Sequence, residues 1–127
     1  MKTFKIITMM LAISLVSFTS CKKDAGMIGK KEITGTVTYK NGATGTNDAA
    51  ANALIHIAFG TKDATTTYDQ TVASGTDGKY LIKGLAKGDY FITAEYTDGN
   101  GVYYTTAGYS LTIGDPKAAL TLDITLQ

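Results

Sequence analysis

The 127-residue chain contains no arginine and no tryptophan, and it has a single cysteine, a single histidine and a single proline. Phosphate and base recognition usually depends on the planar fork of arginine, so we do not expect nucleic acid as a partner. One cysteine cannot form a disulfide within the chain. One histidine and one cysteine also fall short of the usual ligand set of a zinc site. We therefore expect a fold held by its hydrophobic core, with no cofactor.

The first 20 residues have the composition of an export signal. Two lysines precede an apolar run at 6–18, and two small residues then lead directly to Cys21. A membrane-spanning helix needs about 20 apolar residues, and this run is shorter. The pattern is typical of a cleaved signal peptide over residues 1–20.

The end of this segment, "VSFTSC", resembles the lipobox of bacterial lipoproteins, although Phe18 stands where that family usually has leucine. The resemblance implies that a signal peptidase cuts before Cys21 and that Cys21 carries the acyl chains, palmitate among them. The protein would then be held on its membrane by its N-terminal lipid. Lys22 follows the cysteine in place of the aspartate that retains many lipoproteins at the inner membrane, which favours the outer membrane of a Gram-negative bacterium. An ordinary secretory signal that leaves Cys21 as a free thiol is the alternative.

Residues 21–31, "CKKDAGMIGKK", have glycines, lysines and no sustained period. We interpret them as a flexible tether between the lipid and a folded domain. Its lysines fit either of two roles. They can lie against anionic headgroups, where each contributes ~1 kcal/mol to membrane binding. Alternatively, they belong to a spacer that is only solvated.

From residue 32 to residue 127 the hydrophobic pattern has a period of two, which is typical of strands with one wet face. Turn residues separate the periodic runs, and the length suits one domain. The predicted strands cover 32–40, 53–59, 65–74, 79–85, 89–96, 103–113 and 118–127. We therefore predict an all-β fold, a single antiparallel β-sandwich of about seven strands.

The alternation also predicts which side chains face inward. In "DYFITAEY" it points Tyr90, Ile92 and Ala94 into the sandwich and Phe91 and Glu95 toward solvent. In "ALIHIAFG" it places the histidine and the second alanine outside. The Asp-Gly dipeptide at 77–78 predicts a tight turn, because glycine adopts positive φ without steric cost.

Three segments carry a resemblance to a known class of domain. "ITGTVTYKNG", "ANALIHI" and "TDGKYLIKGLAKGDYFITAEY" are similar to the carboxypeptidase regulatory-like and Cna-B-like domains. The resemblance implies a transthyretin/prealbumin-like Greek-key sandwich in which the glycines and aromatic residues hold corners and core. Such folds host many functions, so the resemblance implies little about activity.

An enzyme is not expected. The transthyretin-type fold includes 5-hydroxyisourate hydrolases, which use several histidines and an arginine and end in a tyrosine-arginine-glycine-serine motif. This chain has one histidine, no arginine and the ending "DITLQ". Alternation puts His56 on the solvent face of a strand, and we interpret it as an ordinary exposed histidine.

Two glycine turns, "TDGK" and "TDGNG", resemble fragments of calcium loops. They lack the alternating acidic ligands and the final bidentate glutamate of an EF-hand, so we interpret them as hairpin turns. A weak cation site at Asp98 and Asn100 is the alternative.

Some Cna-B-like domains carry a lysine isopeptide crosslink formed beside a buried acid. The candidates here are Lys31 or Lys40, with Asp123 and Glu95. Alternation points both acids outward, whereas the reaction needs a dry environment, so we do not expect the crosslink.

The tyrosines provide the candidate contact residues. Tyr103 and Tyr104 are adjacent in a predicted strand, so their rings face opposite sides and one of them should be exposed. Phe91 and Tyr109 are candidate neighbours on the same surface. Exposed aromatic rings supply contact area to sugars or protein partners at low entropy cost. Strand propensity alone would also account for tyrosines here.

The sequence thus favours a non-enzymatic lipoprotein of the cell envelope. Its sandwich would bind an envelope protein or serve in assembly. The alternative is a glycan-binding accessory lipoprotein of a polysaccharide-uptake system.

Overall fold

The structure is a computed structural model that describes residues 26, 29–115 and 119–127. The predicted signal peptide, Cys21 and most of the predicted tether lie outside the described residues. Within the described ranges, no helix has the length and apolar character needed to cross a membrane.

The described residues form ten strands, which confirms the all-β prediction. Their bounds are β1 Lys31–Lys40, β2 Asn47–Ala49, β3 Leu54–Phe59, β4 Gln70–Ala73, β5 Lys79–Leu85, β6 Gly88–Thr97, β7 Tyr103–Thr105, β8 Tyr109–Ile113, β9 Ala119–Thr121 and β10 Ile124–Leu126.

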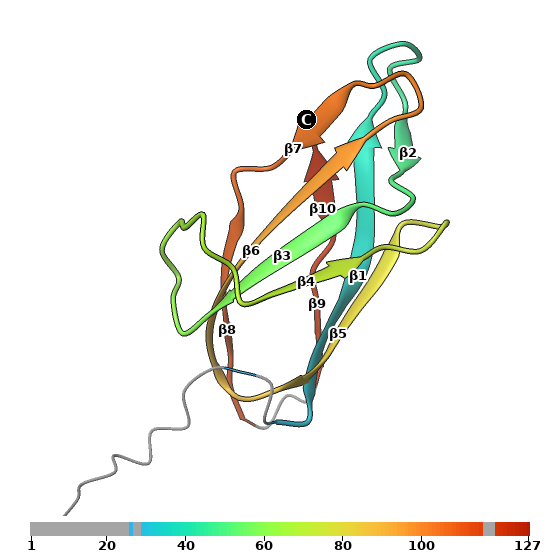
Figure 1. The fold of residues 1–127 in the computed structure, drawn as a ribbon. Coiled ribbons are helices and arrows are strands. Elements are labelled where there is room, and N and C mark those ends of the chain that lie inside the picture. Colours follow the sequence, from blue (N-terminus) through green and yellow to red (C-terminus); the bar gives the residue numbers. More distant parts are fainter. Residues whose placement is uncertain (1–25, 27–28, 116–118) are drawn as a thin grey trace, which may run out of the picture.

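The strands form two five-stranded sheets that pack face to face as a sandwich (Figure 1). In the first sheet, β1 is central, with β5 and β2 on one side and β9 and β10 on the other. The second sheet has the order β4-β3-β6-β7, and β8 also pairs with β6. The long strand β6 therefore runs the length of the second sheet, pairing first with β8 and then with β7.

The C-terminal strands differ from the sequence prediction. Both β9 and β10 pair with β1 in parallel, whereas the other pairs are antiparallel. The predicted strand over 118–127 is interrupted at Leu122 and Asp123. Here the Asp123 carboxylate accepts the hydrogen bond of the Thr36 backbone N–H at 3.0 Å, so a side chain replaces one rung of the ladder.

The same interruption explains why β1 has a glycine at its centre. The carbonyl of Leu122 approaches Gly35 so closely that a Cβ at this position would lie 1.8 Å from the oxygen. Tyr80, on the neighbouring strand, donates its hydroxyl to that carbonyl at 2.6 Å. Burial raises the pKa of Tyr80, and the charge of Asp123 adds to the effect, so the hydroxyl stays protonated as a donor.

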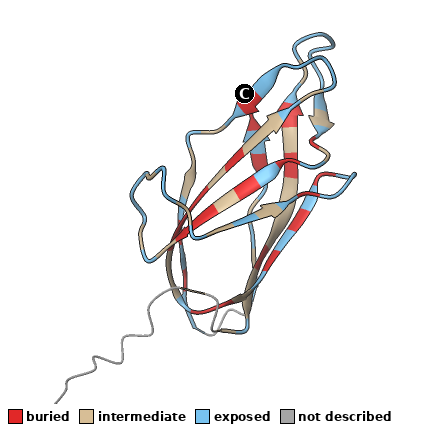
Figure 2. Ribbon diagram, viewed as in Figure 1, coloured by how far each residue is buried: buried red, intermediate tan, exposed pale blue. Residues whose placement is uncertain are grey.

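The hydrophobic core lies between the two sheets (Figure 2). It consists of the inward positions of the alternating strands, so the predicted inward faces are largely confirmed. The buried side chains of the core are Ile33, Val37, Tyr39, Ala50, Ala53, Ile55, Ile57, Tyr80, Ile82, Leu85, Tyr90, Ile92, Ala94, Tyr104, Leu111, Ile113, Ile124 and Leu126.

The prediction that Phe91 faces solvent is wrong. Phe91 lies on the outer side of β6, yet it is only 4% exposed. Gly108 covers its ring, since a Cβ built there would lie 2.3 Å from a ring carbon. The segment before β4 is tied to the same region, because the Ser110 hydroxyl donates to the Lys62 carbonyl. Alternation thus predicted correctly on which side of the sheet Phe91 lies. The ring is buried because a loop folds over that side. The neighbouring Ala58 is buried on the same outer side.

The predicted strand over 65–74 is also shorter, since only Gln70–Ala73 pairs with β3. Residues 65–69, which precede β4, do not form a strand. The Asp69 carboxylate accepts the N–H of Phe59 at 2.7 Å, and its own N–H donates to the carbonyl of Ile57 at 2.9 Å. Through these contacts a loop residue, and not an extension of β4, bonds the backbone at the end of β3.

One end of the sandwich, which we call the basal end, holds the first described residues. Gly26 donates its N–H to the Tyr90 hydroxyl at 3.1 Å and accepts the N–H of Ala86 at 2.8 Å. The Tyr90 hydroxyl in turn donates to the Ala86 carbonyl at 2.5 Å. Lys31 already belongs to β1. Strand β1 therefore begins at Lys31, the last residue of the segment predicted as a tether.

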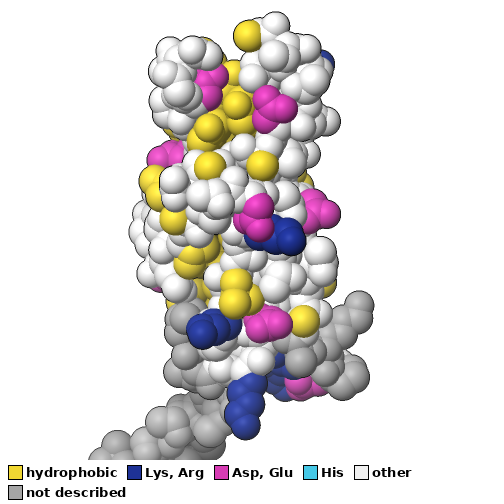
Figure 3. Space-filling model, turned by 90° about the vertical axis from the view of Figure 1, so that its right-hand side faces the viewer, with side chains coloured by type: hydrophobic (Ala, Val, Ile, Leu, Met, Phe, Trp, Pro, Cys, Tyr) yellow, Lys and Arg dark blue, Asp and Glu magenta, His cyan; other side chains and the backbone are white. Residues whose placement is uncertain are grey.

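Ion pairs complete the basal end. The ammonium of Lys31 lies 2.9 Å from the Asp115 carboxylate, and that of Lys87 lies 3.4 Å from it. Both lysines lower the pKa of Asp115, and Lys31 has the larger effect. Figure 3 shows lysine side chains gathered at the lower part of the molecule. At its upper end, acidic side chains flank a recess floored by hydrophobic groups.

Candidate functional site

The structure separates the four aromatic residues that the sequence grouped as candidate contacts. Tyr103 is 58% exposed, whereas Tyr104 is 7% exposed and Phe91 is covered. Tyr109 is half-buried and packs against the core. The described part of the chain therefore presents one exposed tyrosine ring from this group.

Tyr104 belongs to an internal cluster of tyrosines. Its ring centroid and that of Tyr96 each lie 4.8 Å from the centroid of Tyr39. The Tyr104 hydroxyl donates to the Asp98 carboxylate at 3.3 Å. Burial, followed by the neighbouring Tyr96, raises the pKa of Tyr39. These rings fill the sandwich at the end opposite Gly26, which we call the distal end.

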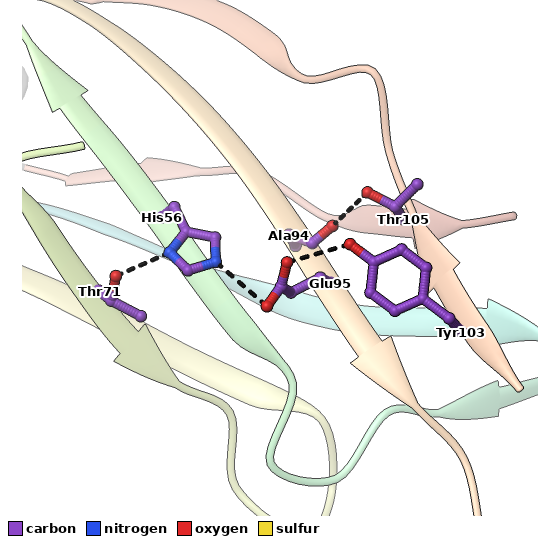
Figure 4. Close-up of polar contacts among 6 residues, drawn as sticks. All are labelled: His56, Thr71, Ala94, Glu95, Tyr103 and Thr105. Atoms are coloured by element: carbon purple, nitrogen blue, oxygen red, sulfur yellow. Dashed lines mark hydrogen bonds and ion pairs between the residues drawn. The ribbon is translucent and has the colours of Figure 1, made fainter. Parts of the chain in front are cut away.

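A polar network crosses the outer side of β4, β3, β6 and β7 (Figure 4). Thr71 and His56 share a hydrogen bond of 2.7 Å between Oγ1 and Nδ1. The Nε2 atom of His56 lies 3.7 Å from Oε1 of Glu95. Oε2 of Glu95 accepts the hydroxyl of Tyr103 at 3.0 Å. The network thus orients the exposed tyrosine through the carboxylate beside it.

The histidine is held from a second side as well. The ring of Tyr68 stacks on the imidazole of His56, with centroids 5.0 Å apart and an interplanar angle of 22°. His56 lies on the outer side of the sheet, as predicted, but it is not the ordinary exposed histidine that the sequence suggested, because the ring is half-buried and has specific partners. The imidazole lies between Thr71, Tyr68 and Glu95.

An open hollow lies beside this network at the distal end. Its volume is about 410 Å³, and it is lined by Ala51, Asn52, Leu54, Glu95, Tyr96, Thr97 and Tyr103. We call it the distal hollow. Its volume falls within the range of about 300–1,000 Å³ that is common for ligand sites.

Apolar and charged side chains meet in the distal hollow. Leu54, 40% exposed, is directly opposite Glu95 in the pairing of β3 and β6. Tyr103 comes from β7 and reaches back to the same carboxylate. The hollow therefore combines an apolar side chain, an aromatic ring and a carboxylate that three different strands bring together.

One wall of the hollow is fixed from the inside by the buried Ser74. Its hydroxyl donates to the Ala50 carbonyl at 2.5 Å and accepts the N–H of Ala53 at 2.9 Å. The Ser74 carbonyl accepts the N–H of Asn52 at 3.2 Å. Asn52 has a φ of 59°, a conformation uncommon outside glycine. Ser74 thus holds the tight turn at 50–53 against the end of β4.

The order Thr71, His56, Glu95 has the residue types of a nucleophile, base and acid. The sheet register accounts for it without catalysis, because His56 is the direct partner of Thr71 and a near neighbour of Glu95 across the strands. The imidazole–carboxylate distance of 3.7 Å is longer than a hydrogen bond. Among the residues that the structure describes, no cluster of three or more histidine, cysteine, aspartate or glutamate side chains could hold a metal ion.

The alternative sites considered from sequence have structural explanations. Asp98 accepts the N–H groups of Asn100 and Val102, each at 2.9 Å, as expected for a turn. Gly78 has a φ of 78°, which confirms the predicted Asp-Gly turn.

The residues considered for an isopeptide crosslink do not meet. Lys31 pairs with Asp115 at the basal end, and Glu95 lies in the distal network. Lys40 and Asp123 are exposed. The arrangement therefore lacks the dry lysine–acid contact that the crosslink needs.

No protein-family model matches the sequence, and no curated protein matches it significantly. Several solved structures share the fold. A candidate carbohydrate-binding protein from Pseudomonas aeruginosa is 14% identical, with a TM-score of 0.51 over 80% of this chain and 91% of that one. The minor pilin of Streptococcus agalactiae is 17% identical, with a TM-score of 0.54 over 77% of this chain and 44% of the pilin. The major pilin subunit of Bacillus cereus is 16% identical, with a TM-score of 0.51 over 78% of this chain and 30% of the pilin.

At these identities the likeness establishes the fold alone. The chain spans less than half of each pilin, so it corresponds to one domain of a longer protein there. The likeness to the pilins agrees with the β-sandwich expected from the sequence.

Tyr103 was one of four aromatic candidates from the sequence, and the hollow beside it was not predicted. Leu54, Glu95 and Asn52 lie far from Tyr103 along the chain, and only the pairing of β3, β6 and β7 brings them together. The outward positions of Leu54 and Glu95 were available from alternation. The pairing register of β3, β6 and β7, which brings these residues to Tyr103, could not be predicted from the alternation.

Proposed function

We propose that the protein is a non-enzymatic lipoprotein of the bacterial cell envelope whose sandwich binds a protein partner or serves in assembly. The lipid would be on Cys21, after removal of residues 1–20, and the membrane would be the outer membrane. The observation that carries the proposal is the distal hollow, where Tyr103 and Leu54 stay exposed at the end of the sandwich farthest from Gly26.

The course of β6 supports this orientation. Its first residues follow the turn that contacts Gly26, and its last residues line the distal hollow. A strand of ten residues spans about 33 Å. A lipid at Cys21 would place the basal end near the membrane and the hollow away from it, where a partner has access.

The fixed geometry of the hollow supports binding more than catalysis. Ser74 holds one wall, and the His56–Glu95–Tyr103 network holds the other. A preorganised surface loses less conformational entropy when a partner binds. Nothing in this arrangement supplies the oriented donors that stabilise a developing oxyanion, which a threonine nucleophile would need.

The proposal can be tested by chemical crosslinking in intact cells that produce the protein natively. The full lipidated protein is captured and compared with Cys21→Ala, and bound material is analysed for protein and for glycan. We expect one envelope protein to be captured by the lipidated form and lost with Cys21→Ala. Absence of any specific protein with both forms would contradict the proposal.

A glycan-binding accessory role in polysaccharide uptake is the second candidate. The exposed Tyr103 ring beside Glu95 favours it, because sugar faces pack on aromatic rings, and one structure of the same fold is a candidate carbohydrate-binding protein. The covered Phe91 and Tyr104 reduce the aromatic platform that this role would use. Polysaccharide retained by both the lipidated form and Cys21→Ala would favour this role over protein binding.

A further inference from the structure

The charge of the distal hollow indicates the chemistry of what it binds. Its seven lining residues include one carboxylate, Glu95, and no lysine. Oε2 of that carboxylate accepts the hydroxyl of Tyr103, and Oε1 lies 3.7 Å from Nε2 of His56. Among the residues that line the hollow, the carboxylate of Glu95 therefore meets no lysine ammonium.

We propose that the distal hollow binds a lysine side chain of the protein partner, an inference that rests on the proposed protein-binding function. The ammonium group would lie on the carboxylate of Glu95, beside Tyr103. The alkyl stem would lie along Leu54.

The geometry of the ring and the carboxylate fits an ammonium group. The hydroxyl of Tyr103 donates to Oε2 of Glu95 at 3.0 Å, which holds the hydroxyl end of the ring beside the carboxylate. A cation over the face of an aromatic ring, within about 6 Å of its centroid, is attracted by the ring. An ammonium group on Glu95 gains this second interaction only where it also lies over the ring face.

The alkyl stem has a matching surface. Leu54 is an exposed apolar residue directly across from Glu95 on the paired strand. Lysine buries its methylene groups along apolar surfaces while its charged end stays on a polar group. The distance between paired residues in a sheet, about 5 Å, matches the length of such a stem.

Lysine fits the hollow better than arginine does. One oxygen of Glu95 already accepts the Tyr103 hydroxyl, which occupies part of the two-oxygen edge that a guanidinium fork uses. A compact ammonium needs one oxygen. A neutral sugar can donate its hydroxyls to Glu95, but it brings no opposite charge to the carboxylate.

The test uses nuclear magnetic resonance titration of the full lipidated protein in detergent micelles. The probe is the blocked peptide acetyl-Gly-Lys-Gly-amide. Control peptides carry norleucine, acetyl-lysine or arginine at the central position, and methyl β-glucopyranoside represents a sugar.

We expect the lysine peptide to shift the signals of Leu54, Glu95 and Tyr103, and the norleucine and acetyl-lysine peptides to leave them unchanged. Glu95→Gln keeps the size of the side chain and an acceptor for Tyr103, yet it should weaken lysine binding at least tenfold. Glu32→Gln changes the only other glutamate of the chain and should leave binding unchanged.

Three results would overturn the inference: equal binding of the norleucine peptide, tighter binding of the arginine peptide, or the same shifts with the glucoside. The two proposals can fail separately. If a protein is captured in cells by Glu95→Gln as well as by the unmodified protein, lysine recognition fails and protein binding stands. If the lysine peptide binds but no protein is captured in cells, lysine recognition stands and the proposed function fails.

Discussion

The two ends of the sandwich are built in different ways. At the basal end, backbone groups approach closely and are satisfied internally, as where Tyr90 bonds both Gly26 and Ala86. At the distal end, the interior is filled by tyrosines, but the outer side keeps an exposed ring and a carboxylate beside a hollow. The contacts at the basal end serve the stability of the fold. The exposed groups at the distal end are not needed for that stability.

This contrast predicts that the same chemical change has different effects at the two ends. Tyr90→Phe removes a buried hydroxyl and leaves the Ala86 carbonyl and the Gly26 N–H without it. We expect a loss of about 1–3 kcal/mol in the free energy of unfolding, measured by urea denaturation. The matched change Tyr103→Phe, at an exposed ring, should stay within about 0.5 kcal/mol. Equal losses for the two variants would contradict the contrast.

Ser74→Ala should affect both the fold and the hollow. The buried hydroxyl bonds Ala50 and Ala53, so its loss should cost about 1–2 kcal/mol and loosen the wall that contains Asn52. Urea denaturation measures the stability, and amide hydrogen exchange at Asn52 measures the wall. Ser110→Ala, whose hydroxyl bonds the Lys62 carbonyl and contacts neither Ala50 nor Ala53, is the control for the exchange at Asn52. Unchanged exchange at Asn52 would show that Ser74 does not hold the wall.

A smaller and more local effect is expected for Gly29→Ala. A Cβ at Gly29 would lie 2.0 Å from the carbonyl oxygen of Leu85, so the segment before β1 must move away. We expect faster amide exchange around residue 29, with a change of about 1 kcal/mol or less in global stability, because the segment lies at the edge of the fold. Gly99→Ala, where a Cβ meets open space, should change neither. The account of the basal end fails if the two variants exchange alike.

The smallest effect should depend on pH. Lys31 and Lys87 lower the pKa of Asp115, so the folded state holds the ionised form more tightly than the unfolded state does. This contribution is complete above the ordinary carboxyl pKa and is lost as the pH falls through the lowered value. Asp115→Asn should therefore lower the melting temperature slightly at pH 7, and the difference should shrink below about pH 4. The exposed Asp63→Asn serves as the control, and a difference that grows in acid would have the wrong sign.

Much of this architecture could be predicted from the sequence because it depends on local rules. Alternation assigned the inward faces of β1, β3, β5 and β6, and the Asp-Gly dipeptide at 77–78 predicted its turn. The parallel pairing of β9 and β10 with β1 could not be predicted, since it joins residues nearly 90 positions apart. The interruption at Asp123 has the same origin, because a side chain replaces a backbone partner that the pattern cannot identify.

The candidate site was predicted only in part. Adjacent tyrosines in a strand must face opposite sides, but the choice of Tyr103 as the exposed one required the register of β6 and β7. Phe91 lost its exposure to a loop that folds over it at Gly108. The pairing of Glu95 with Leu54 and Tyr103 depends on three strands, and no local pattern encodes it.

The contrast between the ends can be tested directly with a photo-crosslinking amino acid in the lipidated protein in intact cells. It replaces Val102, exposed next to Tyr103, in one variant and Lys87, at the basal end, in another. The account predicts a protein adduct from position 102 that Glu95→Gln abolishes, and lipid adducts from position 87. A protein adduct from position 87 with none from position 102 would contradict it.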